Sequence, residues 1–337
     1  MHRRRFIALV GGALLSDRTI FGLVIALALG LLLGIASAQG ADKITRIGFL
    51  SLGSGAGKYF GIFVQRLAEL GHVEGKNLVI EHRWAEKNDQ LPELAAGLVR
   101  ANVDLIVTGG TPATLAAKQA TAKIPIVFTA SAPVEKGIIA SLARPGGNLT
   151  GVALVATMIK PLERLKDAAS GVSHVALLYD PATDPRGAEQ FLTPTRRQAE
   201  TLNIALGPVV LREPGDTNKV FMTLPADTDG LLLQDSNVNL FVRDRICELA
   251  TQRRLPAVGN HPLFASSGCL LSYSQDLVEV NRLVADYIDR ILRGAQPADL
   301  PTEQPTKFDL IINLKTAKEL GLTLPRSILM LADEVIE

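Results

Sequence analysis

The chain has 337 residues, of which 47% are apolar and 20% are charged. This composition excludes a largely disordered chain, and at about 100–200 residues per domain the length predicts two domains. Lysine and arginine number 35 against 34 acidic residues, so the net charge of +1 gives no bulk attraction to nucleic acid, and we expect no nucleic-acid partner.

The first forty residues predict export. Three arginines at positions 3–5 are followed by an almost entirely apolar stretch at 20–36, and Ala36-Ser37-Ala38 is the small-x-small pattern at which signal peptidase cleaves. We therefore assign residues 1–38 to a signal peptide cleaved after Ala38 and place the mature protein in the periplasm. An uncleaved membrane anchor is the alternative, because about 20 apolar residues suffice to span a bilayer. The arginines leave both the Sec and the twin-arginine export routes open.

Beyond residue 43, short apolar runs alternate with amphipathic helical stretches. Strands are predicted at 44–51, 78–82, 104–108, 126–129, 149–155, 175–179, 208–211, 230–233, 256–258 and 310–313. Helices are predicted around the apolar stripes at 60–70, 91–98, 237–254 and 277–291, from Pro112 onward, and as a short helix near the end of the chain. Between residues 186 and 202, Pro194 leaves open whether one helix is continuous or begins at this proline.

Repeated βα units require crossovers between parallel strands, so the pattern predicts an α/β fold of two Rossmann-like lobes with parallel sheets, joined by a hinge. A turn-rich segment at 144–148 separates the two series. We place the first lobe at residues 39–153 plus 275–303, and the second at 154–274 plus 304–337. The expected ligand site is the cleft between the lobes, beyond the carboxyl ends of the strands.

One loop in the first lobe has the features of an anion site. The segment 108–112 follows a strand and opens a helix, with Thr111 available as N-cap and Pro112 as the first helical residue. Free backbone N–H groups at such a helix start favour a carboxylate. An equally good interpretation is that Thr111 only caps its own helix.

Other polar or aromatic side chains follow the remaining strands. These candidate ligand contacts are Ser51, Ser54, Thr129, Ser131, Tyr179, Asp180, Asp235, Ser236, Asn260 and His261. Our hypothesis is that Ser54, Thr111 and Ser131 hold an anionic or polar end of a solute. Asp180, Asp235 and His261 contact the solute from the second lobe, with Tyr179 as a further flat surface. Ordinary turns are the alternative at 51–55 and at Asp180, which precedes a proline.

Catalytic, metal and cofactor sites are not expected. The chain has no Gly-x-Ser-x-Gly elbow and no His-Glu-x-x-His motif, and its two cysteines, Cys247 and Cys269, lack metal-ligand spacing. In an oxidising compartment the two cysteines can pair, but the sequence does not supply their separation in space, so both the paired and the free state stay open.

Several longer motifs carry a family resemblance. Residues 106–112 and 143–151 resemble the ABC transporter substrate-binding protein family with the periplasmic-binding-protein type I fold, and 71–78, 270–273, 301–308 and 312–317 are similar to it as well. The resemblance covers nearly the whole mature chain.

The resemblance implies a non-enzymatic, Venus-flytrap receptor, acting as a monomer without a cofactor, that delivers a small-molecule solute to an ABC permease powered by a separate ATPase. It also implies an amino acid as the solute, with aromatic ones favoured. Three departures from the family pattern predict a remodelled pocket: Ala132 before Pro133 replaces a frequent aspartate, Ser274 replaces a frequent glycine, and the loop 53–58 is short. An exported sensory receptor of the same fold and, further away, an α/β hydrolase are the alternatives.

Overall fold

The computed structural model describes residues 44–53, 58–155, 157–181 and 189–337. The predicted signal peptide and Ser54 lie outside these residues. From Thr45 onward the chain builds two separate β-sheets with mostly parallel strands and helices on their faces, which confirms the predicted α/β class.

The first sheet has five strands in the order β2-β1-β3-β4-β5, and all neighbouring pairs run parallel. Its strands are β1 (Thr45–Leu52), β2 (Leu78–Ala85), β3 (Leu105–Gly109), β4 (Ile126–Ser131) and β5 (Leu149–Leu154). The central strand β3 is buried over Leu105 to Thr108 and starts with three apolar residues, because helices cover both of its faces.

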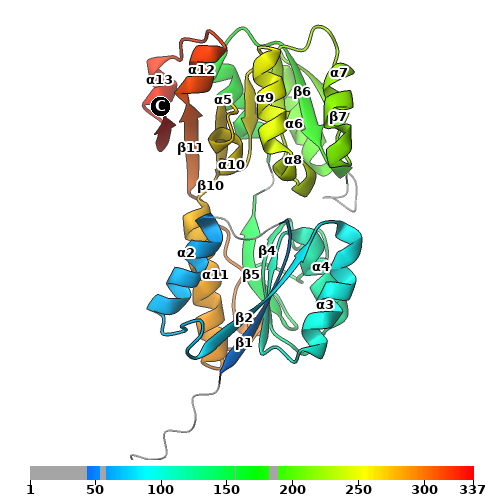
Figure 1. Cartoon of the computed structure of the whole chain (residues 1–337), viewed down its shortest axis with the longest axis vertical. Coiled ribbons are helices and arrows are strands. Elements are labelled where there is room, and N and C mark those ends of the chain that lie inside the picture. The colour runs from blue at the N-terminus through cyan, green and yellow to red at the C-terminus, as the bar shows by residue number, and fades with distance from the viewer. Residues whose placement is uncertain (1–43, 54–57, 156, 182–188) are drawn as a thin grey trace, which may run out of the picture. The chain divides into compact units, whose positions relative to one another are not determined.

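Two pairs of helices cover the first sheet. They are α2 (Lys58–Glu69) with α11 (Leu277–Leu292), and α3 (Leu91–Arg100) with α4 (Thr111–Ala120). Phe63 of α2 and Tyr287 of α11 share one apolar core with Val107, whereas Leu98 of α3 packs on the opposite face with Ile106. In Figure 1 the two pairs lie on opposite sides of the strands. A helix from late in the sequence thus completes the first core.

The second sheet has seven strands in the order β12-β11-β10-β9-β8-β6-β7. Its strands are β6 (His174–Tyr179), β7 (Ala205–Val210), β8 (Gly230–Leu233), β9 (Ala257–Gly259), β10 (Leu271–Gln275), β11 (Phe308–Asn313) and β12 (Glu334–Ile336). The pair β10–β11 is antiparallel, which differs from the purely parallel sheet that the sequence predicted. The reason is that the chain leaves β10 for α11 and returns from the other direction.

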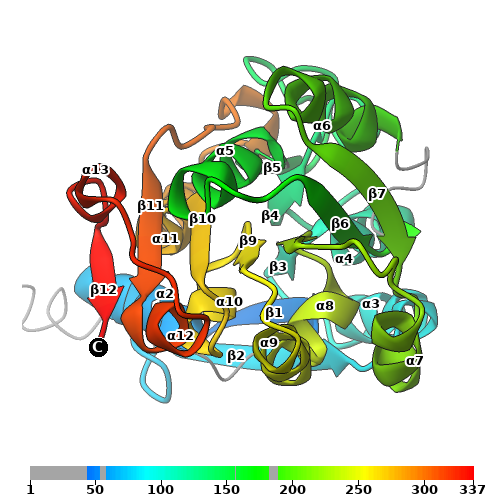
Figure 2. The same ribbon diagram turned by 90° about the horizontal axis from the view of Figure 1, so that it is seen from above.

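Helices also cover both faces of the second sheet. One face carries α5 (Ile159–Ala168), α6 (Glu189–Thr201) and α13 (Arg326–Leu329), and the other carries α7 (Thr217–Met222), α8 (Asn237–Phe241), α9 (Arg243–Gln252) and α10 (Pro262–Ser266). Figure 2 shows α5 and α6 on one side of the strands and α8, α9 and α10 on the other. The short helix α12 (Leu314–Glu319) follows β11, and the 3-10 turns are η1 (Asn88–Gln90), η3 (Pro214–Asp216) and η4 (Pro297–Asp299).

Two local predictions need correction, and one question that the sequence left open is answered. The single helix expected at 237–254 is two helices, because the backbone leaves helical geometry at Val242 (φ −102°, ψ 17°). The helix α6 continues through Pro194, so it does not begin there. At the start of α4 the cap is Gly110, whose φ of 89° suits glycine, and Thr111 and Pro112 follow as the first two helical residues.

The two cysteines are joined. Cys247 in α9 and Cys269 before β10 form a disulfide across a Cα–Cα distance of 4.7 Å. Both side chains are buried in the core on the α9 and α10 face. The sequence left this pairing open, because only the packing of α9 against the end of α10 brings the two residues together.

The chain passes three times between the two sheets, after β5, after β10 and before β11. The buried side chain of Gln275 links all three connections: its Oε1 accepts a hydrogen bond from Val155 N at 2.7 Å, and its Nε2 donates to Pro305 O at 2.8 Å. One amide side chain therefore ties the three connections together.

Candidate functional site

A cavity of about 360 Å³ lies where the strand ends of both sheets meet the connections between them. It is lined by Ser131, Ala132, Glu135, Lys136, Leu154, Val155, Thr157, Pro161, Phe191, Gln234, Asp235, Asn260, His261, Tyr273, Ser274, Gln275, Leu277 and Phe308. Ligand sites in open α/β sheets lie beyond the carboxyl ends of the strands, and this cavity follows that rule. Its volume suits a small solute, since ligand cavities span about 300–1,000 Å³.

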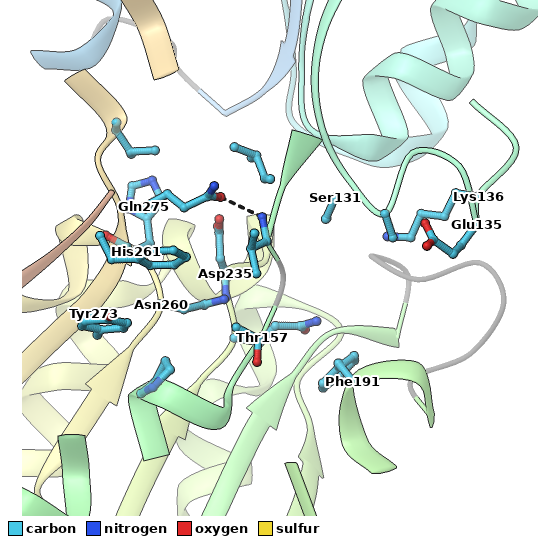
Figure 3. Close-up of a pocket in the computed structure, with 18 residues that line it drawn as sticks. Ser131, Glu135, Lys136, Thr157, Phe191, Asp235, Asn260, His261, Tyr273 and Gln275 are labelled. Atoms are coloured by element: carbon cyan, nitrogen blue, oxygen red, sulfur yellow. Dashed lines mark hydrogen bonds between the residues drawn. The ribbon is translucent and has the colours of Figure 1, made fainter. Parts of the chain in front are cut away.

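Asp235 and Asn260 form the centre of the cavity (Figure 3). They follow the adjacent strands β8 and β9, and the backbone N–H of Asp235 donates to Asn260 Oδ1. Burial raises the pKa of the Asp235 carboxyl, and the nearby His261 opposes this only in part. Keeping the Asp235 carboxyl ionised therefore costs free energy unless a cationic group lies close to it.

His261 stands beside this centre as the N-cap of α10. Its Nδ1 accepts a hydrogen bond from Leu263 N at 3.2 Å, which fixes Nδ1 as the acceptor and leaves the proton of the neutral ring on Nε2. Burial lowers the pKa of His261, although Asp235 acts in the opposite direction. The neutral ring is thus favoured, and its Nε2–H is a hydrogen-bond donor.

Tyr59 contacts His261 from α2, a helix that covers the first sheet. Its ring, at the start of α2, meets the His261 ring edge-on with centroids 6.3 Å apart. Burial, together with the acidic residues Glu334, Asp309 and Asp276, raises the pKa of Tyr59 to about 12. The phenol therefore stays neutral at physiological pH.

The first sheet supplies the charged edge of the cavity. Ser131 ends β4, and the following loop presents Glu135 and Lys136 on the opposite side of the cavity from His261 (Figure 3). Ala132 adopts a left-handed φ of 48°, and Lys136 N donates to Ala132 O at 3.0 Å to close this turn. Left-handed alanine costs about 1–2 kcal/mol, so the surrounding loop must stabilise this conformation.

Aromatic rings supply the apolar surface. Tyr273 and Phe308, on the antiparallel strands β10 and β11, stack with centroids 5.4 Å apart and an interplanar angle of 8°. Phe191 on α6 is supported by Tyr179 in an edge-on contact at 5.7 Å. The cavity therefore combines a carboxylate, a lysine and hydroxyl edge, and flat apolar rings.

The structure brings four of the sequence-predicted residues to this cavity: Ser131, Asp235, Asn260 and His261. Two others bond to neighbouring strands instead, since Ser51 Oγ donates to Gly109 O at 3.4 Å and Thr129 Oγ1 to Thr108 O at 3.4 Å.

The remaining predicted residues do not line the cavity and instead cap helices, pack against neighbouring rings or form backbone hydrogen bonds. Ser236 caps α8 by accepting a hydrogen bond from Asn239 N at 3.1 Å, and Tyr179 packs against Phe191. Asp180 is buried, with its N–H bonded to Gln234 Oε1 at 3.2 Å. Thr111 is buried and Pro112 partly buried at the start of α4, and neither lines the cavity.

Sequence reasoning missed the aromatic surface and the loop after β4. Glu135 and Lys136 lie in the loop that follows the predicted strand 126–129. Counting the whole loop among the candidate contacts, and not only the residues next to the strand end, would have included them. Tyr273 and Gln275 belong to β10, which the sequence did not indicate as a strand, and Phe308 is its partner across the antiparallel pair. These residues share a site only because β11 returns beside β10.

Metal sites and membrane-spanning helices are not found in the described ranges. Within residues 44–53, 58–155, 157–181 and 189–337, no group of three or more His, Cys, Asp or Glu residues is arranged to hold a metal ion. Over the same part of the chain, no helix is both long enough and apolar enough to cross a membrane.

Residues 44–336 match the family described as ABC transporter substrate binding protein. A curated relative, the tyrosine-binding protein of Clostridioides difficile (strain R20291), is 24% identical over 262 residues, which cover 77% of this chain and 75% of the relative.

Solved structures of similar chains show the same fold. A conserved domain protein from Vibrio cholerae superposes with a TM-score of 0.80 at 24% identity, covering 87% of this chain and 100% of that one. The ABC domain from Streptococcus pneumonia in complex with L-Trp gives a TM-score of 0.79 at 22% identity, covering 87% and 99%. Solute-binding proteins of ABC transporters with this periplasmic-binding-protein type I fold are among the structural neighbours, which confirms the predicted fold.

Proposed function

The chain belongs to the ABC transporter substrate-binding protein family, and from this premise we propose that it captures an amino acid, with aromatic ones favoured, for an ABC importer. The exported monomer binds the solute in the periplasm and delivers it to a membrane permease that works with a separate ATPase. It carries out no chemical conversion.

The observation that carries this proposal is the composition of the cavity. An α-amino acid has an ammonium group, a carboxylate and a side chain, and the cavity offers a matching surface for each. Asp235 is the partner for the ammonium, Lys136 and Ser131 are partners for the carboxylate, and the stacked pair Tyr273 and Phe308 offers a flat surface for an aromatic side chain.

The similar proteins support the same class of solute. The relative from Clostridioides difficile is described as tyrosine-binding, and the structure from Streptococcus pneumonia holds L-Trp. The bound solute contacts side chains from both sheets, so binding favours the arrangement in which the lobes enclose it, and the permease responds to that arrangement. We propose the lobe boundaries predicted above, with residues 39–153 plus 275–303 in the first lobe and residues 154–274 plus 304–337 in the second.

The decisive experiment uses the mature protein, residues 39–337. Mass spectrometry of the solute that copurifies identifies the ligand class, and calorimetric titration with L-tyrosine, L-tryptophan and L-phenylalanine measures affinity. We expect binding of at least one of these amino acids, and no change in the ligand after prolonged incubation. Binding of none of them, or chemical conversion of a bound compound, contradicts the proposal.

Asp235→Asn tests the role of the central carboxylate. Removing one partner of an enclosed charge pair costs about 2–5 kcal/mol, so affinity for the amino acid is expected to fall at least about thirtyfold. Asp244→Asn on the exposed face of α9, where the side chain is 78% exposed, is the matched control and leaves affinity unchanged. Equal affinities of the two variants would remove Asp235 from the site.

A further inference from the structure

Two serines on β10 have buried hydroxyls that lack hydrogen bonds. The exposed fractions of Ser272 and Ser274 are 0% and 4%, and neither Oγ has a partner within the described chain. Buried hydroxyls in folded proteins are almost always bonded to protein or to water. Two unbonded hydroxyls two residues apart on one strand therefore indicate a position where another molecule supplies the partner.

Both serines face α10. Ser272 is paired in register with Gly259 of β9, and a Cβ added at Gly259 would lie 2.1 Å from Cδ2 of the Phe264 ring in α10. Side chains alternate along a strand, so Ser274 lies on the same side of the sheet as Ser272. This is the side on which His261 begins α10.

Asp309 adds a third polar atom to this group. It lies directly opposite Ser274 across the β10–β11 pair, so the two side chains share a face about 5 Å apart at Cβ. The Asp309 Oδ1 atom is buried and forms an ion pair with Lys307 Nζ at 3.3 Å. Burial, with repulsion from Asp276, raises the pKa of Asp309. A hydrogen-bond donor arriving here would offset the cost of burying these oxygens.

The cavity reaches this group around the end of β10. Tyr273 and Ser274 are consecutive and point to opposite faces of the sheet, yet both line the cavity. A ring that lies against Tyr273 and Phe308 can therefore project a polar group past the strand end toward the Ser274 hydroxyl.

We propose that Ser274, with Ser272 and Asp309 behind it, forms a polar subsite that binds a hydrogen-bond donor on the side chain of the captured amino acid. The inference rests on the proposed function and narrows its solute to aromatic amino acids whose ring carries a donor, as in L-tyrosine, over L-phenylalanine. Ser274 is thus a specificity residue.

L-tyrosine and L-phenylalanine are the probes, because they differ by one hydroxyl group. A site built to bond a hydroxyl discriminates strongly against the analogue that lacks it, so the wild-type mature protein is expected to bind L-tyrosine at least about tenfold more tightly. Ser274→Ala lowers the L-tyrosine affinity about tenfold and changes the L-phenylalanine affinity less than about twofold. Ser266→Ala, which removes an exposed hydroxyl on α10, is the matched control and changes neither affinity.

Unfolding without ligand gives a second readout. Because the Ser274 hydroxyl has no hydrogen-bond partner among the residues that the structure describes, Ser274→Ala should keep or raise the urea midpoint of the ligand-free protein. A lower midpoint, with equal losses for both amino acids, would show a structural serine and overturn the inference.

The remaining outcomes separate the two proposals. Equal wild-type affinity for the two amino acids, or a Ser274→Ala variant that binds L-tyrosine as the wild type does, means that the hydroxyls hold water only; this overturns the subsite and leaves the proposed function standing. Binding of neither amino acid, nor of L-tryptophan, overturns the proposed function and the subsite with it.

Discussion

The two sheets of this protein differ in which parts of the sequence supply their strands. All strands of the first sheet lie between Thr45 and Leu154 and run parallel. The second sheet begins with the same βα pattern but gains β11 and β12 only after the chain has contributed α11 to the core of the first. This late excursion of the chain creates the antiparallel pair β10–β11, and among the described residues all other strand pairs run parallel. The antiparallel pair carries part of the cavity.

The two sheets also differ in what they offer a solute. The first contributes Ser131, Glu135 and Lys136, from one strand end and the loop after it. The second contributes the carboxylate of Asp235, the Asn260 and His261 side chains, and the stacked rings on β10 and β11. Most of the recognition chemistry therefore belongs to the second sheet, while each sheet has its own core.

The largest expected effect compares one tightly packed glycine in each sheet. A Cβ at Gly151 of β5 would lie 2.1 Å from the backbone oxygen of Phe128, which cannot move without breaking the β4–β5 pairing. At Gly259 of β9 the obstacle is the Phe264 ring, a side chain that can shift within its core. We expect Gly151→Ala to lower the free energy of unfolding by more than about 3 kcal/mol and Gly259→Ala by about 1–3 kcal/mol.

Urea unfolding measures both glycine variants. Gly171→Ala, where an added Cβ meets nothing within 4 Å, is the control and should change stability little. If Gly259→Ala proved the more damaging of the two, the distinction between a backbone and a side-chain obstacle would be wrong.

An intermediate effect is expected from the disulfide, which only the second sheet has among the described residues. The bond between Cys247 and Cys269 closes a loop with a sequence separation of 22, so replacing both cysteines with alanine should cost about 3 kcal/mol through the greater freedom of the unfolded chain. Hydrogen exchange should then show weaker protection in β8 and β9, with β3 unchanged.

A reductant provides the control for the disulfide. It should lower the unfolding midpoint of the wild type and leave that of the double alanine variant unaffected. An equal loss of protection in both sheets would show that the two cores unfold as one unit.

The smallest effect is expected where the sheets are joined. Gln275→Leu removes the bonds to Val155 N and Pro305 O but leaves both cores intact, so stability should fall by only about 1–2 kcal/mol. Amino acid affinity should change as well, because the bonded connections link the two sides of the cavity.

Gln65→Leu is the matched control for the connection. In the described part of the chain the Gln65 side chain bonds to Glu69 of the same helix at 3.1 Å, so its loss should change neither stability nor affinity appreciably. An unchanged affinity in Gln275→Leu would mean that the three connections do not influence ligand binding.

The sequence predicted most of the strands and several of the helices with small boundary errors, because buried apolar periodicity is a local property. It did not indicate β10, β12, α5, α7 or α10. It failed where geometry depended on distant partners. Pro194 is accommodated inside α6, and Val242 interrupts a stripe that looked continuous. The spacing of apolar residues shows neither the continuation of α6 through Pro194 nor the break at Val242, because a single residue seldom changes that spacing.

The candidate site was predictable in part for the same reason. Asp235, Asn260 and His261 follow strands that the pattern showed, and the rule for parallel sheets placed them at a common edge. Tyr273, Ser274 and Phe308 belong to a pairing between β10 and β11 with α11 between them in sequence, so no local signal joined them. The pairing of Cys247 with Cys269 likewise needed the packing of α9 beside α10.

The α/β class, the two series of βα units and the family follow from the amino-acid sequence, because local periodicity and contiguous motifs are enough to identify them. The residues that share the cavity, the position of the antiparallel pair and the buried serine hydroxyls without a partner in the described chain emerge only from the folded structure. Those features depend on contacts between residues far apart in the chain, and local patterns carry no measure of that distance.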